Sequence, residues 1–90
     1  MIKKSYKITS EKGLHARTAT ELVKQASYFI CDIYLTVGKI TVDFKSIMGV
    51  MSIGAYTGEI LNLEFNGSDE SEAEYAISLL ISSLKLGKEI

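Results

Sequence analysis

The sequence has no proline and no tryptophan, only one cysteine and one histidine, and no excess of charge of either sign. A single cysteine excludes an internal disulfide, and one cysteine with one histidine cannot supply the three or four ligands that a zinc site needs. Ten basic residues against eleven acidic ones leave a net charge of −1, which is too weak a field to hold a nucleic-acid backbone. We therefore expect no metal site and no nucleic-acid partner.

Long apolar runs are also missing. No stretch approaches the roughly 20 residues that span a bilayer, and the charged first ten residues are not followed by the apolar part of a secretory signal. We therefore expect a cytoplasmic protein without membrane insertion. Apolar residues make up 47% of the chain and charged residues 23%, which is the balance of a globular protein. With 90 residues and no linker or internal repeat, we expect a single domain over residues 1–90, with a monomer as the default state.

Apolar periodicity predicts the order strand, helix, strand, strand, short helix, strand, helix. Side chains alternate, or repeat at helical spacing, in strands expected over 2–8, 31–37, 40–44 and 61–65 and in helices expected over 19–26 and 73–84. Lys4 interrupts the first alternation, and Gly38 marks a hairpin turn. A short helix is expected after Ser46, and Asp69 followed by Glu72 predicts a capping box for the last helix.

Each of the two long helices is apolar on one side only, so the elements fit a sheet that is covered on one face and open on the other. The predicted fold class is therefore α+β, an open-faced two-layer sandwich built on an antiparallel sheet.

His15 lies in the segment GLHART (residues 13–18), where a loop gives way to the first helix. Backbone N–H groups at a helix start have no partner inside the helix and attract anions, so those of Ala16 and Arg17 would receive a phosphoryl group on the ring. The Arg17 guanidinium adds donors spaced for phosphate oxygens, and Gly13 permits a sharp turn. A lone histidine at this position is also often a simple cap, and from these residues alone the two interpretations are about level.

The segment GLHARTATELVKQASYF closely resembles the active-site segment of the HPr family, the histidine-containing phosphocarriers of the bacterial phosphoenolpyruvate-dependent sugar phosphotransferase system. The resemblance continues through KSIMGVMSIGA to the last helix. It implies a four-stranded antiparallel sheet with three helices on one face. It also implies that His15 accepts a phosphoryl group on Nδ1 from Enzyme I and passes it to sugar-specific enzyme IIA components, with Arg17 attending that group. Such a carrier is not a free-standing catalyst, and no cofactor or metal is implied.

The segment KSIMGVMS (residues 45–52) resembles the version found in low-GC Gram-positive bacteria, in which HPr kinase/phosphorylase modifies the serine that matches Ser46. A phosphate there would add nearly two negative charges to a surface that the phosphoryl donor must approach, so transfer to His15 would weaken. Without the resemblance, Ser46 is best interpreted as an N-cap. A second possible function is a regulatory binding module that acts through phosphorylated Ser46 on a catabolite-control transcriptional regulator.

Ile47, Met48 and Met51 lie in the same segment. Methionines at helical spacing usually fill an interior, so we expect part of this group to be buried. The resemblance implies that the apolar surface around these positions docks successive partners, and adaptable side chains suit that role.

HPr proteins usually have proline where this chain has Thr18. Proline presets the backbone of a first helical turn, so its absence loosens the helix start. Thr18 instead supplies an additional N–H that can reach the phosphate. We predict that phosphoryl transfer survives this difference.

Overall fold

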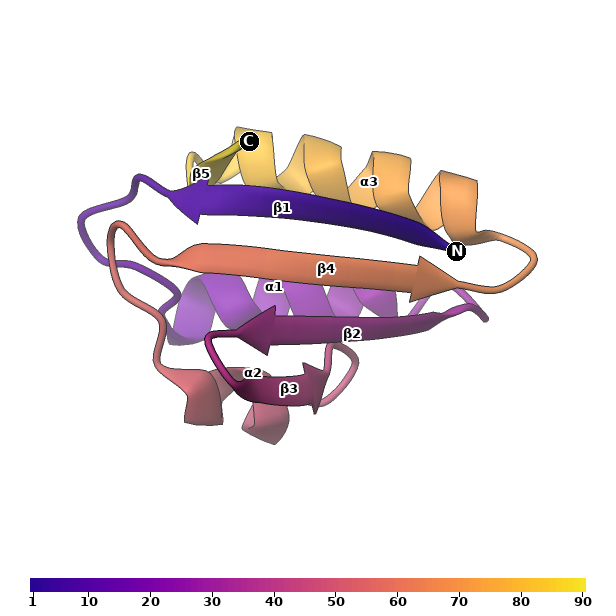
Figure 1. The fold of residues 1–90 in the computed structure, drawn as a ribbon, viewed down its shortest axis with the longest axis horizontal. Helices are drawn as coiled ribbons and strands as arrows, with labels where there is room; N and C mark the ends of the chain where they lie inside the picture. Colours follow the sequence, from indigo (N-terminus) through magenta and orange to yellow (C-terminus); the bar gives the residue numbers. More distant parts are fainter.

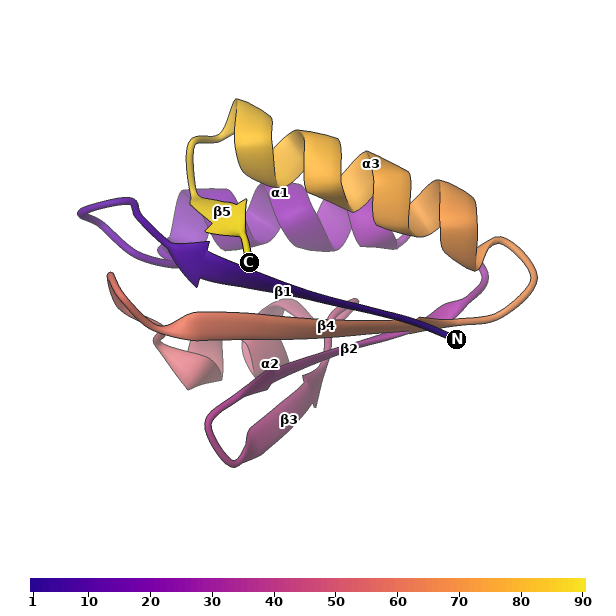
Figure 2. The same ribbon diagram turned by 45° about the horizontal axis from the view of Figure 1, so that its top comes forward.

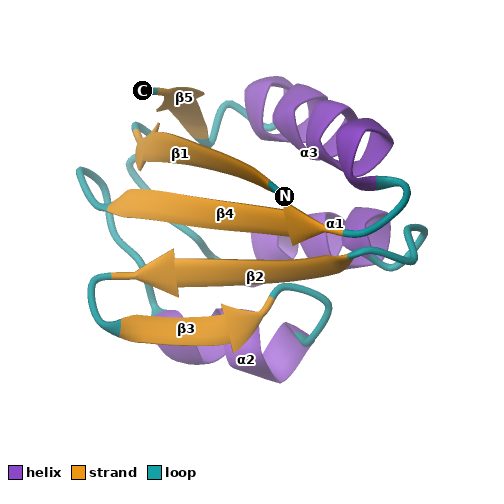
Figure 3. Ribbon diagram, turned by 45° about the vertical axis from the view of Figure 1, so that its right-hand side comes forward, coloured by secondary structure: helices purple, strands orange, loops and turns teal.

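The computed structural model describes all 90 residues. In chain order the elements are β1 (Ile2–Ile8), α1 (Ala16–Ala26), β2 (Asp32–Val37), β3 (Ile40–Asp43), α2 (Ile47–Ile53), β4 (Ile60–Asn66), α3 (Glu70–Ser83) and β5 (Gly87–Glu89). The strands form one antiparallel sheet in the order β3-β2-β4-β1-β5. All three helices cover the same face of the sheet and leave the other face open (Figures 1 and 3). The predicted open-faced α+β sandwich is confirmed.

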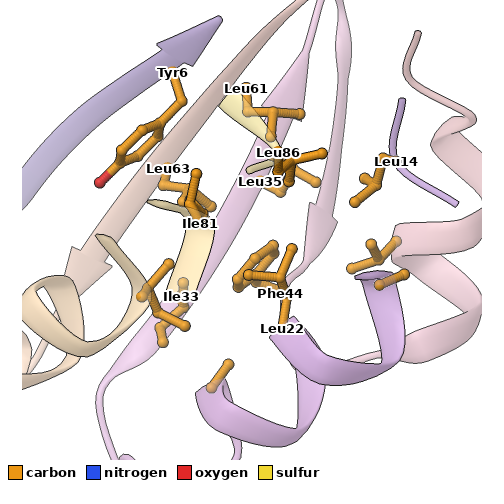
Figure 4. Close-up of a cluster of buried hydrophobic side chains, with 14 of the residues drawn as sticks. Tyr6, Leu14, Leu22, Ile33, Leu35, Phe44, Leu61, Leu63, Ile81 and Leu86 are labelled. Carbon is orange, nitrogen blue, oxygen red and sulfur yellow. The ribbon is translucent and has the colours of Figure 1, made fainter. Parts of the chain in front are cut away.

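The core fills the space between the sheet and the helices. In β2 and β4 every second side chain points toward the helices, and the register pairs Leu35 with Leu63. Helix α1 turns its apolar stripe into this layer, where Leu22 is fully buried, and α3 contributes Ile77 and Ile81. Figure 4 shows Leu22 of α1 and Ile81 of α3 in the same buried cluster as Phe44. The two long helices lie side by side above the central strands (Figure 2).

The sheet has five strands, whereas four were expected. After α3 the chain turns at Lys85, which has a φ of +54°, buries Leu86 and then adds the strand β5 to the free edge of β1. Three residues are too few to display an alternating pattern, so the sequence carries no signal for this strand. It forms because the edge of β1 offers unpaired backbone groups.

Lys4, which interrupted the predicted alternation, is explained by this extra strand. It shares a face of β1 with Tyr6 and Ile8, and its ammonium group lies 3.0 Å from the carboxylate of Glu89 on β5. The hydrogen bond and the charge of Glu89 raise the pKa of Lys4 above its ordinary value. The lysine thus faces a partner at the sheet edge and does not require a different register.

The capping box expected from Asp69 and Glu72 is wrong. Asp69 occupies the N-cap position of α3, but its side chain makes no bond to that helix. Its two carboxylate oxygens instead accept the N–H groups of Ile30 and Cys31, both at 2.9 Å. A local sequence pattern cannot show this, because the partners lie 39 and 38 residues away in the chain. Asp69 therefore fastens the loop between α1 and β2 to the start of α3.

Replacing Asp69 by asparagine is expected to destabilise the fold in a pH-dependent way. The N–H groups of Ile30 and Cys31 hold the pKa of Asp69 below its ordinary value. Such a group stabilises the folded state above the pKa that it has in the unfolded chain, and the contribution is lost as the pH falls through the lower folded pKa. Thermal unfolding should show a lower Tm for Asp69→Asn at pH 7 and a gap that closes below about pH 4. A gap that is constant with pH would contradict this account.

Cys31, the single cysteine, is buried beside this contact. Burial and the neighbouring Asp69 carboxylate raise the pKa of its thiol to about 11, so it is not a nucleophile at neutral pH. It packs as a small apolar side chain. None of the three helices combines the length and the apolar composition that crossing a membrane requires.

Candidate functional site

His15 is the residue that precedes helix α1. Its backbone is extended, with φ of −97° and ψ of 174°, and its carbonyl accepts the N–H of Ala19 at 2.9 Å. Its ring is partly exposed and makes no capping hydrogen bond to the helix amides. The interpretation of His15 as a simple cap is therefore wrong, and the N–H groups at the helix start remain available to another acceptor.

The three residues after His15 have backbone N–H groups without a partner. The N–H groups of Ala16, Arg17 and Thr18 donate to no acceptor in the protein. They lie in the first turn of an eleven-residue helix, where the aligned peptide dipoles favour a negative charge. This is the arrangement that the sequence predicted for binding an anion.

Arg17 is exposed, and its guanidinium forms no ion pair with any carboxylate of the chain. A planar cation without an internal partner, next to a cluster of free amides, can bind two oxygens of a tetrahedral anion. The structure thus brings His15, Ala16, Arg17 and Thr18 together at one helix start.

The loop before His15 is held against the segment that follows α2. Gly13 has a φ of +63°, and the N–H of Leu14 donates to the carbonyl of Ala55 at 3.0 Å. A Cβ atom on Gly13 would lie 2.5 Å from that carbonyl oxygen, so only glycine fits. The side chain of Leu14 is buried in the core (Figure 4). The hydrogen bond to Ala55 and the buried side chain of Leu14 therefore fix the loop that positions His15.

Thr18 has a second contact that the sequence analysis missed. Its side chain is buried, and its hydroxyl oxygen lies 2.8 Å from Nε2 of His15. We expected only the amide of Thr18 to take part. The signal in the sequence is the spacing: Thr18 comes three residues after His15, and side chains three positions apart are neighbours at a helix start.

Ser46 caps the short helix α2, as its local sequence predicted. Its hydroxyl oxygen accepts the N–H of Gly49 at 3.1 Å, and its carbonyl accepts that of Val50 at 2.9 Å. The residue is half-buried. Helix α2 contacts α1, so this cap and His15 belong to two helices that pack together.

Ser46→Ala is expected to lower the free energy of unfolding by about 1 kcal/mol, because it removes the acceptor for the N–H of Gly49. Ser52→Ala in the same helix is the matched control. Its hydroxyl donates to the Gly49 carbonyl and caps nothing, so its loss should cost less than about 0.5 kcal/mol. Urea denaturation measures both values, and equal losses would show that Ser46 is not an important cap.

Ile47, Met48 and Met51 are all exposed, with exposed fractions of 40%, 82% and 39%. The expectation that part of this group is buried is wrong, because α2 turns Val50 into the core and leaves the other face to solvent. We call these three side chains the α2 surface. Tyr56, which follows α2, is 71% exposed, and its backbone passes next to Gly13.

The chain is similar to known proteins along nearly its whole length. The family model described as "PTS HPr component phosphorylation site" matches residues 2–83. The phosphocarrier protein HPr of Neisseria meningitidis is 39% identical over 82 residues, which are 91% of this chain and 92% of that protein. The histidine-containing phosphocarrier protein of Mycoplasma has a structure that superposes with a TM-score of 0.93 at 35% identity, covering 96% of this chain and 98% of the other.

A further similar structure is Crh of Bacillus subtilis, described as a catabolite repression protein that forms a swapped, intertwined dimer. It has a TM-score of 0.71 and 34% identity, and covers 86% of this chain and 88% of that one. The match to the family model spans nearly the whole chain, and the curated relative matches over a similar length. The chain therefore belongs to the HPr family of phosphocarriers of the phosphotransferase system.

Proposed function

We propose that His15 accepts a phosphoryl group on Nδ1 from phosphorylated Enzyme I and passes it to sugar-specific enzyme IIA components. The observation that carries this proposal is the single histidine at the start of α1, partly exposed and followed by three amides without acceptors. Nδ1 has no hydrogen-bond partner in the protein, so no other group of the chain competes for this nitrogen. The Arg17 guanidinium, which has no ion pair, completes the anion-binding group.

In the transfer, the Nδ1 lone pair of His15 forms a bond to phosphorus while the bond from phosphorus to the donor breaks and its electron pair stays with the donor. The same steps run in reverse toward the next acceptor. Phosphoryl transfer requires positioning and charge stabilisation more than covalent assistance from the protein. The free N–H groups of Ala16, Arg17 and Thr18 would donate hydrogen bonds to the phosphoryl oxygens in both transfers.

The open position of the site suits a carrier. A phosphoryl group on a partly exposed ring can be reached by two different proteins in turn, whereas a closed pocket would hold it. The α2 surface (Ile47, Met48 and Met51) is proposed to dock these partners. Its side chains are exposed and apolar, and methionine adapts to different shapes. Titrating Enzyme I into labelled protein should shift the amide resonances of residues 47–51, and shifts confined to the open sheet face would refute this assignment.

Ser46 is proposed as a site that HPr kinase/phosphorylase modifies in order to weaken transfer to His15. The resemblance of residues 45–52 supports this, and so does the packing of α2 against α1, which brings a charge on Ser46 to the side of the molecule that carries the α2 surface. Incubation with the kinase and ATP should add an acid-stable phosphate that Ser46→Ala prevents. No incorporation, or incorporation into Ser46→Ala, would refute the assignment.

The second candidate is a regulatory binding module that acts through phosphorylated Ser46 on a transcriptional regulator. The similarity to Crh, a catabolite repression protein, favours keeping it. The swapped dimer described for Crh bears on oligomeric state, for which a monomer stays our prediction, as does a cytoplasmic location. The presence of His15 with free amides and a free arginine favours the carrier, because a module that used only Ser46 would need none of them.

The direct test is to incubate the protein with phosphoenolpyruvate and Enzyme I and to measure its mass. A gain of one phosphoryl group that acid removes is expected, because phosphohistidine is acid-labile and phosphoserine is not. Without any gain, the carrier function would be refuted.

A further inference from the structure

We propose that the hydroxyl of Thr18 sets the tautomer of His15: it accepts the Nε2–H and thereby leaves the lone pair on Nδ1, the atom that attacks phosphorus. This inference rests on the proposed function, since it assigns a positioning residue to that reaction. It concerns the Thr18 side chain, which is separate from the role of its amide.

The geometry that carries the proposal is the distance of 2.8 Å between Thr18 Oγ1 and His15 Nε2, within the ordinary range for a hydrogen bond. Thr18, which is 6% exposed, is the only buried residue with a polar or charged side chain other than the tyrosine and cysteine of the core. Its hydroxyl has no other partner in the chain, whereas the hydroxyl of Thr20, two residues on, donates to the carbonyl of Ala16. A threonine in a helix divides mainly between two χ1 rotamers, and the one present here directs the hydroxyl oxygen to His15 and not to a helix carbonyl.

The donor in this hydrogen bond can be inferred from the proposed reaction, which needs a lone pair on Nδ1. A neutral imidazole carries its proton on one nitrogen, and the hydrogen bond made by one nitrogen fixes the state of the other. If the Thr18 hydroxyl donated to Nε2, the proton would lie on Nδ1 and block the attack. If Nε2–H donates, Nδ1 is free.

The hydrogen bond between Thr18 and His15 also becomes stronger as Nδ1 is phosphorylated. When Nδ1 bonds to phosphorus, positive charge develops on the ring, and the Nε2–H becomes a charge-assisted donor to Thr18. The hydroxyl therefore stabilises the phosphorylated ring more than the free ring. Proline, the usual residue here in the family, has no hydroxyl, so this chain has its own means of orienting the histidine.

The test uses three variants and two measurements. Thr18→Val keeps the shape and removes the hydroxyl, and Thr18→Ser keeps the hydroxyl. Thr20→Val removes a hydroxyl from the exposed side of the same helix and is the matched control. The tautomer of His15 is measured by long-range nitrogen NMR on the unphosphorylated protein at a pH where the ring is neutral. The rate of phosphorylation is measured with phosphoenolpyruvate and Enzyme I.

We expect the unmodified protein to show Nε2–H as the dominant tautomer, and Thr18→Val to show a mixture with phosphorylation slowed by about tenfold, the effect of one charge-assisted hydrogen bond. Thr18→Ser should stay within about threefold, and Thr20→Val should match the unmodified protein. A dominant Nδ1–H tautomer in the unmodified protein would overturn the proposal, and this measurement needs no variant to fold. It would also be overturned if Thr18→Val kept either its tautomer or its rate. If no version were phosphorylated, the proposed function would fail, while the tautomer spectrum, recorded without Enzyme I, would still be informative.

Discussion

Replacing His15 by alanine is expected to abolish phosphorylation by phosphoenolpyruvate and Enzyme I, a loss of several orders of magnitude. The chain has one imidazole, and its one thiol is buried with a pKa of about 11, so there is no second imidazole and no reactive thiol to take the phosphoryl group in place of His15. Mass spectrometry before and after acid treatment measures the effect, because only the acid-labile increment should disappear.

Two controls belong with this result. His15 is partly exposed and makes no capping bond, so His15→Ala should change the free energy of unfolding by less than about 1 kcal/mol. Any phosphate that the kinase and ATP place on Ser46 should still form on His15→Ala. An acid-labile phosphoryl group on His15→Ala would place the chemistry elsewhere and refute the account of the site.

Gly13→Ala is expected to have the second-largest effect, because it damages both stability and the site. The new Cβ would lie 2.5 Å from the carbonyl oxygen of Ala55 on a backbone with a φ of +63°. Relief requires the loop to move, and the hydrogen bond from the Leu14 N–H to the same carbonyl is then lost. We expect a loss of about 2–4 kcal/mol in the free energy of unfolding, from backbone strain, overlap and the broken bond together. Phosphorylation should slow by at least about tenfold because His15 is displaced.

Gly38→Ala separates the two causes. Gly38 has nearly the same backbone, with a φ of +61°, but a Cβ there meets no atom within 4 Å. It should cost only about 1 kcal/mol and leave phosphorylation unchanged. Urea denaturation and the transfer assay measure both variants. Equal losses of stability would show that the contact with Ala55 does not hold the site in place.

The arrangement of the sheet and helices could be predicted because most elements carry a local signal. Alternation in β1, β2 and β4 and the apolar stripes of α1 and α3 depend only on neighbouring residues. The fifth strand could not be predicted, since its three residues pair with β1 from the far end of the chain. The partners of Asp69 were missed for a related reason, because its carboxylate reaches a loop that is distant in sequence.

The candidate site was predictable in its residues but less so in its contacts. His15, Ala16 and Arg17 are adjacent, and the free amides follow from the position of a helix start. The bond between Thr18 and His15 depends on two side-chain rotamers, which the sequence does not specify. The exposure of Met48 and Met51 follows from which side of α2 faces the core, and seven residues give too short a pattern to decide that.

We propose that the His15 ring at the start of α1 receives the phosphoryl group and that the three free backbone amides after it hold that group. The most direct measurement is the proton–nitrogen NMR spectrum of the labelled protein before and after phosphorylation by phosphoenolpyruvate and Enzyme I. We predict large shifts for the His15 ring and for the amides of Ala16, Arg17 and Thr18, with the resonances of the sheet unchanged. A phosphorylated protein in which these amides keep their resonances would contradict the account.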